Sequence, residues 1–277
     1  MTAARGRSGP GAGVPVGRRR VRSVEDVEVA VVEVGSATLP AVVVAHGVGS
    51  SARFVAAAFG GPLVDAGWRL VTYDLRGHGA STPVREPGRH SLERHVADLD
   101  AVVASVAGTV EGVGGVSMGA HAAVRWAATS AWTGGTVLAC LPAWVGRAVP
   151  GEGAHAAVAA EVREVGVAGV LTRLRADATL PRWLRETLVT DYARHDEDSL
   201  AAALVALDGA EAPGPPELAA LVAPLGVVAW PDDPGHPLAV ARSWSAHAPS
   251  ARLATLAIAD LEGDLGALGR AALTVLG

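Results

Sequence analysis

Ser117 lies in the segment Gly115-Val116-Ser117-Met118-Gly119, which has the pattern Gly-x-Ser-x-Gly. A serine at a sharp turn between a strand and a helix has a strained backbone and needs small neighbours, and its hydroxyl then projects clear of the sheet. The apolar run 112–116 precedes this turn and the small-residue segment 118–128 follows it, so the order strand, turn, helix is predicted. The chemistry expected is nucleophilic attack by the Ser117 hydroxyl, with the helix N-terminus beneath it favouring negative charge.

The elements that must position this turn alternate between short apolar runs and helical segments. The run Ala41–Ala45 is continuous and apolar, as expected of a central parallel strand covered on both faces. Strands are expected at 27–34, 41–45, 69–73, 112–116, 136–141, 225–230 and 252–258, and helices at 53–66, 91–106, 118–128, 237–247 and 265–276. This order predicts an α/β fold with a doubly wound, mostly parallel sheet, in which 27–34 lies near an edge.

The stretch 143–224 breaks this alternation. It predicts three or four helices, at about 154–165, 167–176, 181–192 and 199–207, followed by a stiff connector at Pro213–Pro216. We expect this block to form a helical cap over the carboxyl edge of the sheet, inserted into a core made of 21–142 and 225–277. Residues 1–20 are rich in Gly, Pro and Arg, and we expect them to be a disordered leader outside the fold.

Four segments together resemble the α/β-hydrolase superfamily, in its order and at its usual spacings. They are His46-Gly47-Val48-Gly49, Asp74–Ser81, the turn at Ser117 and Asp232-Asp233-Pro234, and the likeness covers the chain from about Val27 to its end. The resemblance implies an oxyanion hole formed by the backbone N–H groups of Val48 and Met118, which would stabilise the charge that develops during acyl transfer. It also implies a triad acid after the strand 225–230.

The spacing from that strand favours Asp233 as the acid over Asp232, and the competing interpretation is an aspartate that only caps the next helix. His46 is a candidate for the substrate pocket, although a structural role, with its ring hydrogen-bonded to nearby backbone, is favoured. For Asp74–Ser81 we favour a tight turn that buttresses the site without a chemical role.

The sequence departs from the superfamily at the base. A serine hydroxyl needs a base to take its proton, and the resemblance implies a histidine in the loop after the last strand. That loop reads Ala259-Asp260-Leu261-Glu262-Gly263-Asp264, the expected position aligns best with Leu261, and no histidine follows His247. Leucine cannot accept a proton.

Three explanations compete. Another histidine substitutes, and His236, three residues after Asp233, is the best candidate; His121 is on the same face of the helix as Ser117 but is expected to pack beneath the turn. Alternatively, the fold serves non-hydrolytic chemistry, or it binds a ligand in a catalytically silent site. The acidic residues near Leu261 could orient a cationic group, although a solvated loop is favoured.

Aromatic residues near the cap are candidates for the pocket wall. Trp144 follows the strand 136–141, while Trp183 and Tyr192 are on a cap helix, where ordinary cap core is an equal alternative. If they face the site, the pocket is apolar and favours an uncharged or hydrophobic acyl group. The other histidines of the second half, His155, His195 and His247, are expected on solvated helix faces or caps.

Composition excludes several classes of function. The chain of 277 residues is 50% hydrophobic and 18% charged, with a formal net charge of −5, so it has no basic footprint for nucleic acid. No run approaches the roughly 18 consecutive apolar residues of a membrane span. The lone cysteine, Cys140, excludes an intramolecular disulfide, and no cluster has metal-ligand spacing. We therefore expect a cytoplasmic protein with a small-molecule substrate, no cofactor and no metal, and leave a homo-oligomer open.

These observations favour a serine hydrolase acting on a small or medium ester, thioester or lactone, with an atypical or incomplete triad. Ser117 would attack, and Asp233 would orient a non-standard base, by preference His236. A non-hydrolytic or silent ligand-binding member of the same fold is the alternative.

Overall fold

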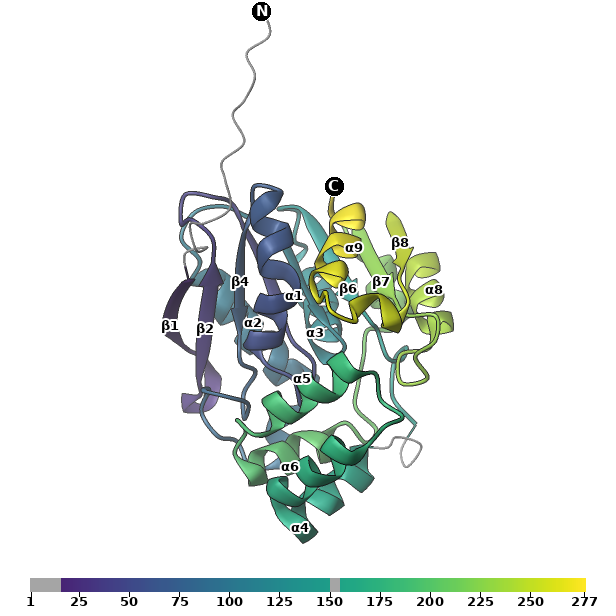
Figure 1. The fold of residues 1–277 in the computed structure, drawn as a ribbon. Helices are drawn as coiled ribbons and strands as arrows, with labels where there is room; N and C mark the ends of the chain where they lie inside the picture. The colour runs from purple at the N-terminus through teal and green to yellow at the C-terminus, as the bar shows by residue number, and fades with distance from the viewer. Residues whose placement is uncertain (1–15, 150–154) are drawn as a thin grey trace, which may run out of the picture.

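The computed structural model describes residues 16–149 and 155–277 and contains one sheet of eight strands (Figure 1). The strands lie in the order β1-β2-β4-β3-β5-β6-β7-β8. Their bounds are β1 Val16–Arg22, β2 Glu28–Val34, β3 Ala41–Ala45, β4 Arg69–Tyr73, β5 Val110–Val116, β6 Thr136–Cys140, β7 Leu225–Ala229 and β8 Ala251–Thr255. Strands β4 to β8 and β3 pair in parallel, whereas β1 and β2 are antiparallel to their neighbours.

Helices cover both faces of this sheet, as doubly wound folds require (Figure 1). Helices α1 (Ala52–Asp65) and α9 (Gly266–Leu276) share an apolar core with one face, which includes Phe59 and Leu268. Helices α2 (Leu92–Ala104), α3 (Met118–Ser130) and α8 (Leu238–His247) pack on the other face. All residues of β3, β4 and β7 are buried; β3 and β7 accordingly contain no polar side chain, whereas β4 also buries Arg69 and Thr72. The predicted α/β fold is therefore confirmed.

Among the described residues, four helices lie between β6 and β7, and we call them the helical insertion. They are α4 (His155–Ala176), α5 (Arg182–Tyr192), α6 (Glu197–Ala206) and α7 (Pro215–Ala219). Helices α4 to α6 form a core of their own around residues such as Val162 and Leu200. In Figure 1 they lie below the sheet, at the end toward which the parallel strands run. Helix α7 begins within the predicted connector Pro213–Pro216, because proline suits the first turn of a helix.

Residues 1–20 were expected to form a disordered leader outside the fold. This prediction is wrong for residues 16–20, and residues 1–15 lie outside the described residues. Residues 16–22 form β1, which pairs with β2 along its whole length. Val21 is buried, and Arg19 donates hydrogen bonds to Glu33 and Ser105 at 2.9 and 2.8 Å. These contacts order a segment whose run of arginines resembles a tail in the sequence.

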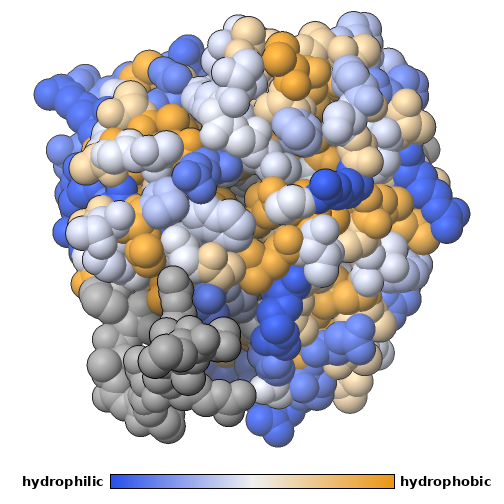
Figure 2. Space-filling model, turned by 90° about the horizontal axis from the view of Figure 1, so that it is seen from above, coloured by the Kyte–Doolittle hydropathy of each residue, from blue (hydrophilic) through white to orange (hydrophobic). Residues whose placement is uncertain are grey.

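Figure 2 shows the molecule from above Figure 1, opposite the helical insertion, where apolar and polar residues are interspersed. Within residues 16–149 and 155–277, no helix combines the length and apolar character that a bilayer crossing needs. The same residues hold no group of three or more His, Cys, Asp or Glu side chains arranged to ligate a metal ion.

Candidate active site

Ser117 occupies the turn between β5 and α3 with a left-handed backbone, φ 54° and ψ −117°. Such a conformation is rare for a residue other than glycine, and it is tolerated here because the neighbours are small. A Cβ on Gly115 would lie 2.3 Å from the carbonyl carbon of Gly119, and one on Gly119 would lie 2.5 Å from the carbonyl oxygen of Ala45. Both glycines of the sequence pattern are thus required by close backbone approach.

His236 joins Ser117 to Asp233. Its Nε2 lies 3.0 Å from the Ser117 Oγ, and its Nδ1 lies 2.6 Å from the Asp233 Oδ2. Since a carboxylate only accepts, Nδ1–H donates to Asp233, which leaves Nε2 to accept the hydroxyl proton of Ser117. Both Asp233 and His236 come from the loop between β7 and α8. The structure therefore brings together the three residues that the sequence analysis selected as nucleophile, acid and base.

The Asp233 carboxylate is held in its charged form. Burial by itself would raise its pKa, but the hydrogen bond and charge of His236, together with the backbone N–H groups of Gly235 and His236, lower the pKa below its usual value. Its second oxygen accepts the Gly235 N–H at 2.8 Å. Asp232, the less favoured candidate, is exposed and only approaches the Ile258 N–H at 3.4 Å.

The predicted oxyanion-hole residues are Met118, which follows Ser117 in the chain, and Val48. Met118 is the first residue of α3, so its N–H has no acceptor within the helix. Val48 lies in the loop after β3 and packs against the cluster that contains Met118. Neither N–H donates to any residue that the structure describes. Both N–H groups are therefore unpaired among the described residues.

His46 is not a pocket residue, and its inclusion among the pocket candidates is wrong. Its ring is fully buried; Nδ1–H donates to the Gly47 carbonyl at 2.7 Å and Nε2 accepts the Leu75 N–H at 2.9 Å. The structural role favoured from the sequence is the one the geometry supports. In the neighbouring turn, Asp74 accepts the N–H groups of Ala52 and Ala80, both at 2.9 Å.

Two further histidines hold the loop that contains Val48. The Gly49 N–H donates to His78 Nε2 at 2.9 Å, and the Gly49 carbonyl accepts from His195 Nε2 at 3.1 Å. His195, between α5 and α6, was expected on a solvated surface but is buried, and its Nδ1 accepts the Gly79 N–H at 3.0 Å. The same insertion supplies Asp191, which accepts the Ser51 hydroxyl at 2.7 Å. Sequence pattern gave no signal for this contact, because it joins residues far apart in the chain.

The loop after β8 lacks a polar group directed at Ser117. Leu261 is fully buried in an apolar cluster with Trp183 and Trp230, whose rings meet edge to face at 5.6 Å. The Trp183 Nε1–H donates to the Ile258 carbonyl at 2.9 Å. Trp183 also lines a hollow of about 290 Å³, and Ser117 is not among the residues that line this hollow.

The acidic side chains of that loop have local partners. Asp260 accepts the Ala257 N–H at 2.8 Å, and Asp264 pairs with Arg270 at 2.5 Å. Asp260 thus caps a turn and Asp264 forms an ion pair, which agrees with the solvated loop favoured from the sequence.

On the opposite side of the site, His121 and Trp144 pack together. Their rings meet edge to face at 4.8 Å, and Trp144 contacts the cluster that contains Met118. His121 is fully buried and its Nε2 accepts the Ala143 N–H at 3.1 Å, so it is packed beneath the turn as expected. Trp144 thus remains a candidate pocket wall.

The buried histidines predict a loss of stability in mild acid. Burial lowers the pKa of His46 from 6.5 to about 4 and that of His121 to about 3. Between pH 6.5 and those values the unfolded chain binds more protons than the folded one, so stability is complete above the unfolded pKa and falls as pH falls. Each such histidine contributes up to about 1.4 kcal/mol per pH unit.

The check is the urea midpoint of unfolding between pH 7.5 and 5, a window in which carboxylates of ordinary pKa stay charged. The urea midpoint should stay nearly constant down to about pH 6.5 and then decrease as the pH is lowered to 5. A midpoint that does not change across this window would contradict the burial of neutral histidines.

Residues 37–203 match the model of the Hydrolase_4 family, described as serine aminopeptidase, S33. The matched segment contains Val48 and Ser117 and ends before Asp233 and His236. No curated protein sequence gives a significant match to the chain.

Solved structures are similar over most of their length. The enol-lactonase from Burkholderia xenovorans LB400 is 22% identical, over 86% of this chain and 91% of that chain, with a TM-score of 0.70. A hydrolase from Pseudomonas aeruginosa PA01 is 22% identical, over 94% and 98%, with a TM-score of 0.73. The bottromycin epimerase BotH, in complex with bottromycin A2, is 23% identical, over 94% and 99%, with a TM-score of 0.67. At these identities the likeness shows the fold alone.

Proposed function

The chain belongs to the Hydrolase_4 family of α/β-hydrolases, and on that premise we propose that it is a serine hydrolase that cleaves a small or medium ester, thioester or lactone. The observation that carries the proposal is the position of His236, 3.0 Å from the Ser117 Oγ and 2.6 Å from Asp233. Nucleophile and base in hydrogen-bond contact, with a third group orienting the base, form the arrangement that activates a hydroxyl.

The reaction follows from this geometry. The Ser117 oxygen attacks the acyl carbon while its proton passes to His236 Nε2, and the N–H groups of Val48 and Met118 hold the oxyanion. Collapse of the tetrahedral adduct breaks the bond to the alcohol or thiol, which takes the proton from His236. Water, deprotonated by His236, then cleaves the acyl-serine ester and restores the hydroxyl. Asp233 stays ionised and stabilises the imidazolium at each step.

In this proposal, the helical insertion is the cap that covers the active site. Its residues Asp191 and His195 are bonded to the loop 49–51, beside the proposed oxyanion hole. Trp144, which follows β6 and precedes the insertion, is the aromatic wall we assign on the other side. An apolar, aromatic wall favours an uncharged acyl group.

A fluorophosphonate probe tests the proposal, because it reacts with activated serines. We expect a mass increase at Ser117 within minutes to hours, no labelling of Ser117→Ala, and full labelling of the control Ser243→Ala on α8. Hydrolysis of p-nitrophenyl esters and of acyl thioesters should exceed that of the matching anilides. If folded protein is not labelled and no ester is turned over, the hydrolase proposal fails and a non-hydrolytic use of the fold takes its place.

Leu261→His tests whether the family's usual base position still matters here. We expect no gain in kcat and a decrease of about 2–4 kcal/mol in the free energy of unfolding, because an imidazole would replace a fully buried leucine without a designed partner. Leu261→Met, which nearly conserves volume, should cost less than about 1.5 kcal/mol. Urea unfolding and ester turnover measure both effects. A clear rise in kcat in Leu261→His would argue that His236 is not the working base.

A further inference from the structure

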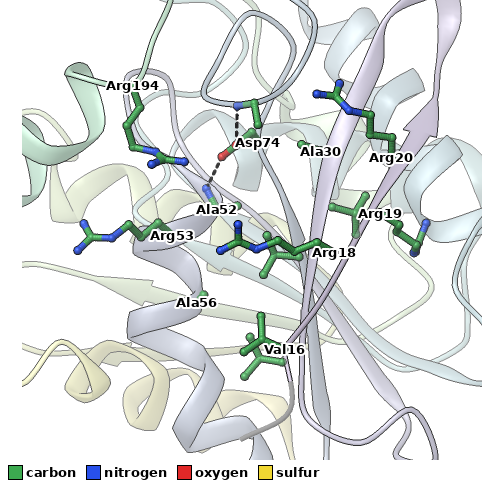
Figure 3. A pocket seen from close by; sticks show the side chains of 14 residues that line it. Val16, Arg18, Arg19, Arg20, Ala30, Ala52, Arg53, Ala56, Asp74 and Arg194 are labelled. Carbon is green, nitrogen blue, oxygen red and sulfur yellow. Dashed lines mark hydrogen bonds between the residues drawn. The ribbon is translucent and has the colours of Figure 1, made fainter. Parts of the chain in front are cut away.

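A groove lies between the outer strands of the sheet and helix α1 (Figure 3). It encloses about 650 Å³, and the residues that line it come from β1, β2, α1, the turn after β4 and the turn between α5 and α6. None of Ser117, Asp233 and His236 belongs to its lining. Whatever binds there binds outside the proposed active site.

Strand geometry places arginine side chains in this groove. Because side chains alternate along a strand, Arg18 and Arg20 share one face of β1, whereas Arg19 turns to the other and pairs with Glu33. Figure 3 shows Arg18 and Arg194 directed toward each other across the groove, with Arg53 at its border.

Within the residues that the structure describes, the guanidinium groups of Arg18 and Arg194 form no ion pair. Arg53 forms none either, although its charge acts on the nearby Asp191 carboxylate, and Arg20 pairs with Glu28 at 3.8 Å. The sequence contains no acidic residue before Glu25 that could neutralise them. Asp74, the one carboxylate in the lining, has both oxygens occupied by the N–H groups of Ala52 and Ala80.

The positive groove is a local feature, since the whole chain carries a net charge of −5. Like charges gathered in a hollow repel one another, and an anion relieves that repulsion. Arginine is suited to this task because its planar guanidinium binds carboxylate and phosphate through paired hydrogen bonds.

The walls between the arginines are apolar, and they comprise Val16, Ala30, Val31, Val32, Val34, Ala52, Ala56 and Ala80. An inorganic anion alone would leave this surface in water. We propose that the groove binds a small amphipathic anion, with its carboxylate or phosphate head between Arg18 and Arg194 and its apolar body along the valine side chains of β2.

Octyl phosphate is the probe, with octanol and inorganic phosphate as its two halves, and isothermal titration calorimetry on the full chain is the measurement. We expect one octyl phosphate per chain, weaker binding at high salt, and at least tenfold weaker binding of either half. The double variant Arg18→Ser/Arg20→Ser, on β1, should weaken binding about tenfold or more. Arg194→Ser, between α5 and α6, should weaken binding by a similar factor. The control Arg242→Ser/Arg252→Ser removes the same charge from exposed positions elsewhere and should bind as the unaltered chain does.

The proposal is overturned if the unaltered chain does not bind octyl phosphate at millimolar concentration. It is also overturned if the control double variant loses as much affinity as Arg18→Ser/Arg20→Ser, which would indicate an unspecific charge effect. Flotation with phosphatidylglycerol vesicles distinguishes a lipid surface: chain that floats with vesicles without binding the monomeric probe would point to a membrane and against this site. Loss of Ser117 labelling by fluorophosphonate affects none of these outcomes.

Discussion

His236→Ala is expected to lower kcat for ester hydrolysis by on the order of 10⁴-fold, with a much smaller change in KM. The imidazole is the only group that the described structure places between Ser117 and a carboxylate, and alanine leaves the hydroxyl without an acceptor for its proton. Labelling of Ser117 by fluorophosphonate should slow in parallel, because that reaction requires the same proton transfer. Steady-state kinetics and intact mass measure the two effects.

His247→Ala is the matched control, since it removes an exposed histidine from the end of α8, and it should retain full activity. Added imidazole should restore part of the rate of His236→Ala, because the side chain it replaces is 24% exposed and solvent can enter the space. Undiminished turnover in His236→Ala would remove His236 from the mechanism.

Asp233→Asn should lower kcat by on the order of 10³-fold while the protein stays folded. The carboxylate accepts Nδ1–H of His236 and so keeps Nε2 free for Ser117; an amide can instead donate to Nδ1, which selects the opposite tautomer. Loss of the negative charge also removes the stabilisation of the imidazolium. The variant should bind substrate with a nearly unchanged KM, because Asp233 does not contact the acyl group in this mechanism.

Asp232→Asn is the neighbouring control and should behave as the unaltered chain, since Asp232 is exposed and makes only a long contact with Ile258. Equal losses in the two variants, or a loss confined to Asp232→Asn, would show that the acid has been assigned to the wrong aspartate.

Much of the fold was predictable because its signals are local. A continuous apolar run identified the buried strand Ala41–Ala45, and the predicted bounds 41–45 and 69–73 agree with β3 and β4. Strand β1 was missed because three successive arginines hide the alternation that pairing imposes. The boundary predicted between helices 154–165 and 167–176 agrees with the break in α4 at Gly166, whose backbone is non-helical at φ 71° and ψ 168°.

The site was predictable in part. Ser117 and Asp233 follow strands at recognisable spacings, so their sequence neighbourhood identifies them. The approach of His236 to Ser117 depends on how the loop after β7 lies beside α3, and residue spacing alone left it as one alternative among several. The contact of His195 with Gly49 joins the insertion to the loop after β3, and its only sequence signal was a histidine of unremarkable context.

The base and its acid are three residues apart in one loop, and their relative position is set within that loop. The Gly235 N–H bound to Asp233 fixes the turn between them, so neither the acid nor the base is supplied by the C-terminal segment. In an arrangement with acid and base on separate loops, any shift of the last strand or helix would misalign the proton relay. Here, length changes around Gly263 should be tolerated by the chemistry, which leaves that region free to diverge.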